Sequence, residues 1–361
     1  MKRFILGLMT AALAAGTLAS AQGPTPYKLG TFERQGRTFV GVVLRDSVVI
    51  DLGAANAAIR TPAATVPAPA DMKDLIVRYD TGVKARIADI VASVERGANG
   101  ARPAYVYDLK ALKTLPPIMY PTTMMNVAVN YRDHELEMRP PAAGQAAAPG
   151  TAPAGTQGAP GIWQRAADDK RWNPYMFLKA PAAIVANEDA IRIPPGRVQI
   201  DWECEMGVVI GRQGLRVPLA EADRYIFGYT IENDVSDRGG RGDNRYGSDW
   251  MIHKSHDTFA PMGPFIVPKE FIANVKNLTI KSTLNGQPWQ DANTSLMIHD
   301  VFEQVMYASN IMTVRPGDVI ATGSPAGVGA GRTPPVFLKA GDRTVCTYEG
   351  VGTLSNPVVG S

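Results

Sequence analysis

The segment Asp201–Glu205 (DWECE), set inside a run of apolar residues, constrains this chain more than any other. Alternate side chains of a strand point to the same face, so Glu203 and Glu205 share one face and Cys204 points to the other. The flanking residues predict one continuous buried strand over 198–210. Two inward carboxylates repel each other and lose hydration, and a hard divalent cation relieves both penalties. The segment therefore indicates a site for magnesium, manganese or calcium, the alternative being an edge strand whose glutamates face water.

The segment Asn126–Glu137 (NVAVNYRDHELE) is a short apolar stretch followed by polar residues typical of a helical turn. On a helix, His134 and Glu137 are three residues apart and share a face. An imidazole beside a carboxylate is the usual arrangement of a general base that activates water near neutral pH. Taken alone, such a histidine would more often be an exposed surface residue.

Two further segments combine a polar side chain with Gly and Pro residues. The stretch 247–264 places Lys254 among aromatic, Pro and Gly residues; without its neighbouring motifs, a solvated loop cation would be the simpler interpretation. The stretch 316–329 (PGDVIATGSPAGVG) predicts a strand that ends in a Gly-rich loop with Thr322 at its tip. This loop lacks the Gly-Lys-Ser/Thr and the dinucleotide spacing of nucleotide-binding loops, which argues against a nucleotide site.

Taken together and in this order, these segments resemble the fumarylacetoacetate hydrolase family. The resemblance runs from about Pro121 to the C-terminus and rests on short motifs that are weak singly. It implies a β-rich α+β fold, a mixed β-roll with the active site at its mouth, and a homodimer. The matching residues are Asn130 and Tyr131 with His134 and Glu137, Phe177–Lys179, Glu203 and Glu205, Gly228–Thr230 with Asn233–Ser236 and Arg238, Lys254 with Gly263 and Pro264, Asn285 and Gly286, and 316–329.

The resemblance also implies a role for individual side chains. It implies three ligands, Glu203, Glu205 and Asp234, for Mg²⁺ or Mn²⁺, with Ca²⁺ as an alternative. It implies His134 and Glu137 as a water-activating dyad, assisted by Lys254. The residues that it implies for substrate binding are Tyr131, Lys179, Arg238 and Thr322.

The chemistry implied by the resemblance centres on small 2-oxo acids. The family's known activities are hydrolysis of a C–C bond in acylpyruvates and β-diketo acids, and decarboxylation, isomerisation or dehydration of related 2-oxo acids. A metal chelated by the acid's carboxylate and carbonyl acts as a Lewis acid and stabilises the enolate that departs when the C–C bond breaks. We therefore expect an acylpyruvate-type hydrolase, with a decarboxylase or isomerase of the oxaloacetate or 5-carboxymethyl-2-hydroxymuconate type as the alternative.

Two departures from the family's pattern keep a third interpretation open. Gly239 and Arg241 stand where many members carry an Asp and a Gln after the arginine that Arg238 matches. The substrate's polar contacts therefore differ, and Arg241 would favour a more acidic ligand. An exported protein that binds metal and carboxylates without turning them over would fit these departures as well.

Residues 1–21 have the features of a secretory signal peptide. A basic start (1–3) precedes an apolar stretch rich in Leu and Ala, and Ala19–Ala21 (ASA) is a small-residue cleavage site. The alternative is an apolar first helix of the mature fold. No other apolar run is long enough to span a bilayer. We expect an exported, periplasmic protein cleaved near Ala21.

The rest of the chain is predicted to form two domains. Residues 27–115 predict a small N-terminal domain with strands at 28–32, 38–44 and 47–52, a Pro/Ala linker at 61–70, and a helix from Asp71 to about Arg96.

Residues 116–361 predict the catalytic domain. Its capping box, Asp300–Glu303, opens a helix with Val301, Val305, Ser309 and Met312 along one side. Within this domain, residues 141–160 form an Ala/Pro/Gly/Gln tract without periodicity, which predicts a flexible insertion where members of the resembled family have a lid. The tract is either a slack extension of that lid or an inert insertion; we expect the inert insertion, with lid function at 161–165.

The two cysteines of the chain, Cys204 and Cys346, could pair in an oxidising compartment. Because Cys204 lies inside the proposed metal strand, where a bridge would constrain the site, we expect two buried free thiols instead. The formal net charge of +3 is slight and unclustered, so nucleic acid is not an expected partner.

Overall fold

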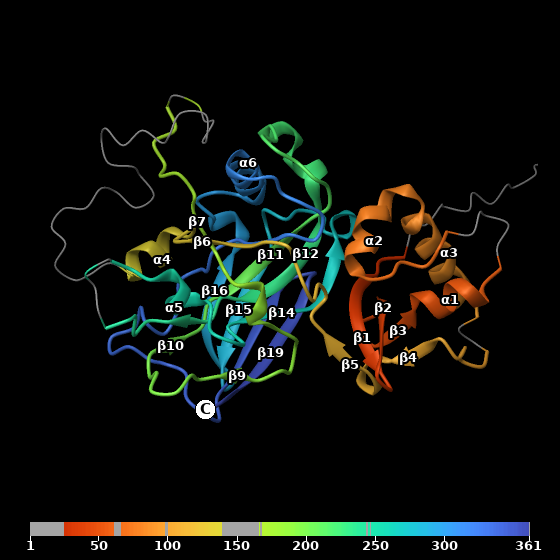
Figure 1. Ribbon diagram of the computed structural model, residues 1–361, viewed down its shortest axis with the longest axis horizontal. Coiled ribbons are helices and arrows are strands. Elements are labelled where there is room, and N and C mark those ends of the chain that lie inside the picture. The colour runs from red at the N-terminus through yellow and green to blue at the C-terminus, as the bar shows by residue number, and fades with distance from the viewer. Residues whose placement is uncertain are drawn as a thin grey trace, which may run out of the picture.

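Figure 1 shows the computed structural model, which describes residues 25–60, 66–97, 100–138, 166, 168–242, 245 and 247–360. Strands outnumber helices, as expected of a β-rich α+β chain. The predicted signal peptide, the predicted insertion, the lid segment expected at 161–165 and residues 61–65 of the predicted linker lie outside the described residues. Within these ranges, none of the helices combines the length and apolar character needed to cross a membrane.

The N-terminal domain is an antiparallel sheet covered by helices, red to orange in Figure 1. The β1–β2 hairpin turns at Gln35 and Gly36, which both have positive φ, as a tight hairpin turn requires. All three predicted strands form, but Asp51 ends the third one and caps the helix that follows. The strands are β1 (Lys28–Arg34), β2 (Arg37–Leu44), β3 (Val48–Asp51), β4 (Val106–Asp108) and β5 (Lys113–Leu115).

The single helix predicted from Asp71 to about Arg96 is wrong. The structure has α2 (Met72–Arg78), a short 3-10 turn η1 (Tyr79–Thr81) and then α3 (Val83–Arg96). The break occurs at Gly82, whose φ of 123° is incompatible with a helix and is readily adopted only by glycine. Together with α1 (Leu52–Ala58), these helices bury their apolar faces against the sheet.

The sheet that contains β1–β5 continues directly into the second half of the fold, because β1 pairs with β14 (Ala260–Pro268). The other strands of this sheet are β6 (Met124–Ala128), β7 (Tyr175–Leu178), β8 (Ile184–Val185), β11 (Cys204–Ile210), β12 (Ile226–Asn233) and β17 (Val319–Ala321). Strand order in this sheet is β4-β3-β2-β1-β14-β12-β11-β17-β6-β7, with β5 beside β1 and β8 beside β14. Strands β11, β12 and β14 are buried along their whole length and provide a rigid base for the side chains at their ends.

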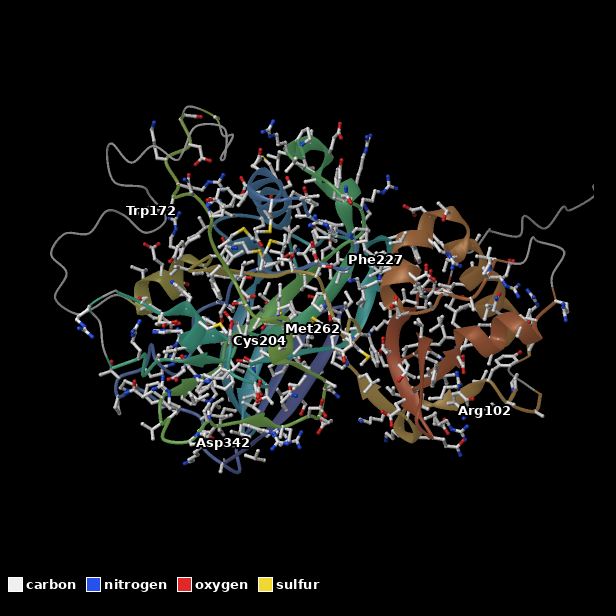
Figure 2. The ribbon with its side chains drawn as sticks, viewed as in Figure 1. Arg102, Trp172, Cys204, Phe227, Met262 and Asp342 are labelled. Carbon is white, nitrogen blue, oxygen red and sulfur yellow. A yellow bond between two sulfur atoms is a disulfide. The ribbon has the colours of Figure 1, made fainter. Side chains whose placement is uncertain are left out.

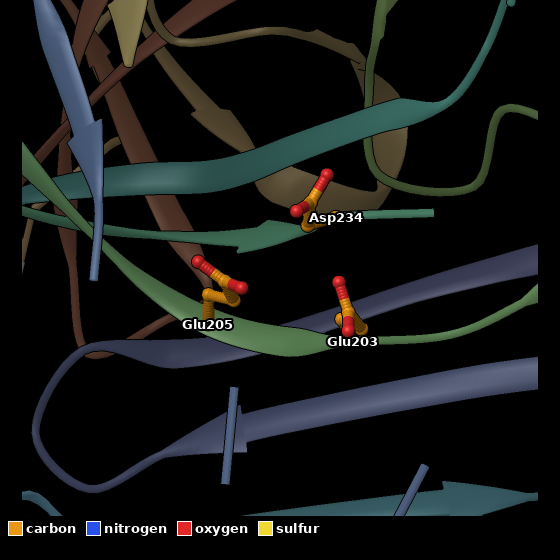
Figure 3. A group of neighbouring side chains, drawn as sticks. All are labelled: Glu203, Glu205 and Asp234. Carbon is orange, nitrogen blue, oxygen red and sulfur yellow. The ribbon is translucent and has the colours of Figure 1, made fainter. Parts of the chain in front are cut away.

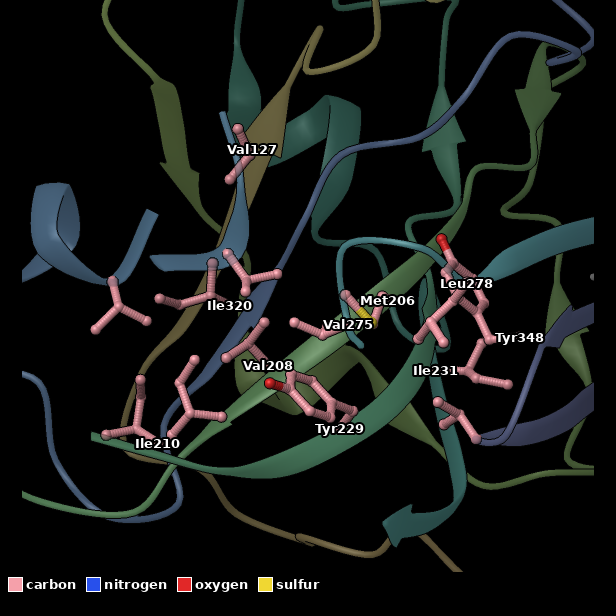
Figure 4. Close-up of a cluster of buried hydrophobic side chains, with 14 of the residues drawn as sticks. Val127, Met206, Val208, Ile210, Tyr229, Ile231, Val275, Leu278, Ile320 and Tyr348 are labelled. Atoms are coloured by element: carbon pink, nitrogen blue, oxygen red, sulfur yellow. The ribbon is translucent and has the colours of Figure 1, made fainter. Parts of the chain in front are cut away.

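A second sheet packs on β11 and β12, and the main hydrophobic core lies between the two sheets (Figure 4). Met206 and Ile231 come from the large sheet, and Ile280 and Tyr348 come from the second. The second sheet has the order β16 (Gln287–Asn293), β15 (Thr279–Leu284), β18 (Arg343–Tyr348), β19 (Gly352–Val359) and β9 (Ile191–Arg192). Further 3-10 turns are η2 (Leu109–Ala111), η3 (Pro181–Ala183), η4 (Leu219–Tyr225), η5 (Lys269–Phe271) and η6 (Thr294–Leu296).

The predicted continuous strand over 198–210 is also wrong. The structure has β10 (Ile200–Asp201), paired with β13 (Ser236–Asp237), and then β11, with Trp202 and Glu203 between them outside any strand. The chain leaves the ladder because Asp201 accepts hydrogen bonds from the backbone of Gly329 and Ala330 in the Gly-rich loop. The interruption brings this loop to the start of β11.

The expectation of two free thiols is contradicted, because Cys204 and Cys346 form a disulfide with Cα atoms 5.6 Å apart. Cys204 points away from its two glutamate neighbours into the core between the sheets, near the centre of Figure 2. It meets Cys346 of β18 there, so the bridge lies behind the glutamates and not among them. The disulfide joins the two sheets across 142 residues of chain.

The predicted capping box is confirmed at the start of α6 (Val301–Ile311). Asp300 accepts from the backbone of Phe302 and Glu303, and the Glu303 side chain accepts from the backbone of Asp300. Val301, Val305 and Ser309 are buried as predicted, whereas Met312 ends the helix.

We expect Asp300→Ala to lower the free energy of unfolding by about 1 kcal/mol, because two first-turn N–H groups lose their acceptor. Urea denaturation followed by circular dichroism measures the change. Asp291→Ala is the matched control. Asp291 is exposed, and its ion pair with Lys281, at 3.9 Å on the surface, contributes little to stability. Equal losses in both variants would show that the cap has no special role.

Candidate active site

Three carboxylates meet where β11 and β12 bring their ends together (Figure 3). Glu203 and Glu205 point from the β11 segment toward Asp234, which follows β12 directly. One oxygen from each lies within 4.8 Å of the others, and all three side chains are buried. The backbone holds this arrangement, because Asp234 N donates to Glu203 O at 2.8 Å. The predicted ligand set is therefore brought together as expected.

A fourth carboxylate, Glu232, was missed by the sequence reasoning. It is fully buried and pairs directly across the strands with Glu205. Strand alternation from Asp234 back to Glu232 was the signal that could have found it. Burial and the neighbouring carboxylates raise the pKa values of Glu205 and Glu232 well above their ordinary range.

With its carboxyl groups ionised, as ligation of a metal requires, this buried cluster has two more carboxylates than permanent cations among the described residues, which is the charge of one divalent ion. All-oxygen ligation and this surplus fit Mg²⁺ or Mn²⁺. The carboxylates are Asp201, Glu203, Glu205, Glu232 and Asp234, and the cations are Lys179, Arg238 and Lys254.

Lys254 and Arg238, two predicted site residues, reach this cluster. The Lys254 ammonium, buried on α5 (Trp250–Lys254), donates to both Glu203 and Asp234. Burial opposes its charge, but Asp234 and Glu203 raise its pKa above the usual value. Arg238 donates to Glu203 Oε1 at 2.6 Å and to Asp201 Oδ2. Burial would raise the pKa of Glu203, yet Arg238 and Lys254 together hold it well below its ordinary value.

Lys179, predicted to bind substrate, does not line the pocket beside the dyad. Lys179 is 1% exposed, and its ammonium donates to Asp234 and to the backbone of Val235. It lies 3.8 Å from Glu232 Oε1. Lys179 therefore offsets the charge of the buried carboxylates without lining the pocket.

The predicted dyad forms on α4 (Arg132–Glu137). His134 Nδ1 lies 2.7 Å from Glu137 Oε1, and His134 is 4% exposed, so it is no free surface histidine. Gly327 N also donates to Glu137, which marks Glu137 as an acceptor and His134 Nδ1 as the donor. His134 Nε2 is left facing Glu203 Oε1 at 3.6 Å. Burial lowers the pKa of His134, but the bonds to Glu137 and Glu203 outweigh burial and raise it.

Two other predicted substrate residues, Thr322 and Tyr131, do not face the pocket beside the dyad. Thr322 is completely buried, and Ser324, two residues later, lines the pocket in its place. The intervening Gly323 N donates to Glu205 Oε2 at 2.8 Å, so the loop contacts the ligand set through its backbone. Tyr131 is 2% exposed and borders a different cavity.

The pocket over the three carboxylates has a volume of about 170 Å³. His134, Arg238, Lys254 and Ser324 form its polar wall, and Val129, Met138 and Trp250 form its apolar wall. Drug-sized ligands occupy roughly 300–1,000 Å³, so a cavity of this size suits a short acid. Arg241 lies outside this wall and is 3.5 Å from Asp249.

We expect Ser324→Ala to raise KM for an acidic substrate several-fold with little change in kcat, since one hydroxyl bond contributes about 1 kcal/mol. Steady-state kinetics measures both constants. The paired control is Thr322→Val, whose buried hydroxyl does not reach the pocket. A larger KM effect in the Thr322 variant would return the substrate contact to that residue.

Comparison with known proteins places this site in a family. Residues 123–359 match the family model for the C-terminal part of fumarylacetoacetate (FAA) hydrolase. The chain is 33% identical to the mitochondrial oxaloacetate tautomerase fahd2 of Xenopus laevis over 78% of this chain and 81% of that protein. It is 32% identical to oxaloacetate tautomerase YisK of Bacillus subtilis (strain 168), over 92% and 99% respectively.

Solved structures show the same fold along the whole length of their chains. The fumarylacetoacetate hydrolase of Exiguobacterium antarcticum is 27% identical, with a TM-score of 0.67, and the match covers 93% of this chain and 100% of that one. The maleylpyruvate hydrolase of Sphingobium sp. SYK-6, solved with manganese(II) and pyruvate, is 25% identical with a TM-score of 0.64; that match covers 92% and 99%.

Proposed function

Because the chain belongs to the fumarylacetoacetate hydrolase family, we propose that it is a metal-dependent enzyme that interconverts the keto and enol forms of a small 2-oxo dicarboxylic acid such as oxaloacetate. The observation that carries the proposal is His134, whose Nε2 faces the carboxylate triad while Nδ1 is held by Glu137. The small pocket and the two tautomerase relatives support this substrate class.

The triad has the composition to hold a divalent ion, which would supply Lewis acidity toward the 2-oxo carboxylate group of a bound acid. His134 Nε2 takes a proton from the carbon next to the ketone and returns it. Glu137 keeps Nδ1 protonated and stabilises the charged imidazolium that this transfer creates. Arg238 and Lys254 on the pocket wall orient the acid's oxygens, and Met138 and Trp250 limit the entry of water.

The test follows the ultraviolet absorbance of enol oxaloacetate as it converts to the keto form, using the purified full chain with Mg²⁺ or Mn²⁺ and then with EDTA. Proton NMR in D₂O checks the same step through exchange at the carbon beside the ketone. We expect faster conversion that EDTA abolishes. Release of pyruvate and carbon dioxide would identify a decarboxylase instead, and metal binding without any turnover would identify a binding protein.

Hydrolysis of a C–C bond in an acylpyruvate is the second candidate. It is supported by the same dyad, because His134 and Glu137 could deprotonate a water as well as a carbon acid. The likeness to a maleylpyruvate hydrolase supports it too. Loss of the diketone absorbance with release of two acids, in the absence of oxaloacetate tautomerisation, would favour this activity.

We also propose that the protein is exported. The bonded pair Cys204 and Cys346 supports this proposal, because such bonds persist in oxidising compartments. The mature protein recovered from the periplasm of an expressing bacterium is expected to begin at Gln22. A protein found only in the cytoplasm with its first residues intact would refute this proposal.

The homodimer stays a prediction, which light scattering after size-exclusion chromatography would check.

A further inference from the structure

The residue between two proposed metal ligands, Cys204, is held from behind by the second sheet. Its side chain is bonded to Cys346 of β18, on the face opposite Glu203 and Glu205. Both sulfurs are buried in the core between the sheets. A covalent bond therefore limits how far the peptide carrying both ligands can move toward or away from the site.

The side chain of Gln290 in β16 holds the same peptide by a hydrogen bond to the backbone of Cys204. Its Oε1 accepts from Cys204 N at 3.2 Å and from Ser282 Oγ at 2.9 Å. Its Nε2 donates to Ser324 Oγ at 2.7 Å and to Pro325 O at 2.9 Å. All four hydrogen-bonding positions of this buried amide are used. Gln290 thus connects the ligand segment to the loop residue that lines the pocket.

The ligand segment needs such support because it lies where regular strand pairing begins. Glu203 is outside any strand, and its N–H donates to the side chain of Asn233 and not to a neighbouring strand. The three ligand carboxylates lie within 4.8 Å of one another, and like charges this close repel. Lys254 and Arg238 offset part of that repulsion, and a restraint behind Cys204 adds to this by keeping the two glutamates at ligand spacing.

We propose that Cys346 and Gln290 are positioning residues of the metal centre, which act through Cys204 to hold Glu203 and Glu205 at ligand spacing. This inference rests on the metal centre of the proposed function but not on its substrate. Changes in groups that support metal ligands typically weaken metal affinity by about 10–100-fold. Each restraint should therefore contribute about tenfold.

The experiment measures Mn²⁺ binding to the metal-free full chain by isothermal titration calorimetry, with the electron paramagnetic resonance spectrum of bound Mn²⁺ as a second readout. The variants are Gln290→Met and the double variant C204A with C346A. We expect each to bind Mn²⁺ about tenfold more weakly and with a broadened spectrum. Ile87→Ala is the control: Ile87 is fully buried in α3 of the N-terminal domain, so its truncation destabilises the chain far from the site.

Each result has a defined meaning. Variants that bind Mn²⁺ as tightly as the wild type overturn the positioning role and leave the proposed function standing. A wild-type chain that binds no Mn²⁺ overturns both. Weakened binding in Ile87→Ala as well assigns the effect to general loss of stability and overturns the positioning role. If the double variant does not fold, two measurements provide the same comparison. One uses Gln290→Met, and the other uses the wild-type chain after reduction of its disulfide, which is verified by counting free thiols.

Discussion

Glu205→Gln is expected to weaken Mn²⁺ binding by more than the roughly 10–100-fold that changes outside the ligand shell cause, because a ligand itself is lost. The same change should leave the metal-free chain at least as stable as before. Glu205 is buried beside other carboxylates, and both effects raise its pKa. Its negative charge therefore opposes folding when no cation is present. Calorimetric titration with Mn²⁺ and thermal denaturation in EDTA measure the two effects.

The raised pKa of Glu205 also predicts how the stability of the metal-free chain changes with pH. The ordinary carboxyl pKa is 4.5, and the folded value for Glu205 is higher. Above pH 4.5 the folded chain therefore keeps a proton that the unfolded chain has released, so the contribution of this group to stability falls as the pH rises toward the folded pKa. Glu205→Gln removes this contribution and should flatten the decline.

Glu232→Gln is the matched control for Glu205→Gln. It removes the same charge from a carboxyl that is equally buried and also has a raised pKa, but Glu232 does not belong to the ligand triad. It should stabilise the metal-free chain similarly and weaken Mn²⁺ binding far less. Equal loss of Mn²⁺ binding in the two variants would remove Glu205 from the ligand set.

His134→Ala is expected to lower kcat by about 10²–10⁴-fold, the usual contribution of a positioned acid–base group. Mn²⁺ affinity should change only a few-fold, because His134 is bonded to Glu137 and is 3.6 Å from the nearest ligand oxygen. Stopped-flow measurement of enol conversion and calorimetry separate the two quantities.

His253→Asn is the control for His134→Ala. His253 lies on the same short helix as Lys254 but does not line the pocket. Both kcat and the affinity for Mn²⁺ should therefore stay at the wild-type values. Wild-type turnover by the His134 variant, in the presence of Mn²⁺, would mean that another group transfers the proton.

Local patterns were sufficient for the parts of the site that lie within one element. The two-residue period of a strand predicted that Glu203 and Glu205 share a face, and the helical spacing predicted the contact of His134 with Glu137. The capping box at Asp300 was equally local. Such features depend on backbone geometry over a few residues, which neighbouring sequence decides.

Assignments that depended on what lies across the fold were less successful. Lys179 and Thr322 are buried in the segments expected of the site but do not line the pocket, because packing between distant segments decides which side chains line it. The strand over 198–210 was expected to be unbroken, because no local signal shows that Asp201 binds the backbone of a loop more than 120 residues later.

The amino-acid sequence by itself indicated the β-rich character of the chain, and alternation and spacing of residue types indicated the Glu203 and Glu205 pair and the contact of His134 with Glu137. Asp234 entered the candidate ligand set through the family resemblance, and the structure brings it to the two glutamates. Only the tertiary structure decided that Cys204 bonds to Cys346, that Lys179 pairs with Asp234 and that Ser324 lines the pocket. The physical reason is that burial and electrostatic compensation depend on which distant segments meet. Two thiols 142 residues apart become neighbours only when the two sheets pack. Five carboxylates and three cations become neighbours only when separate segments of the chain meet.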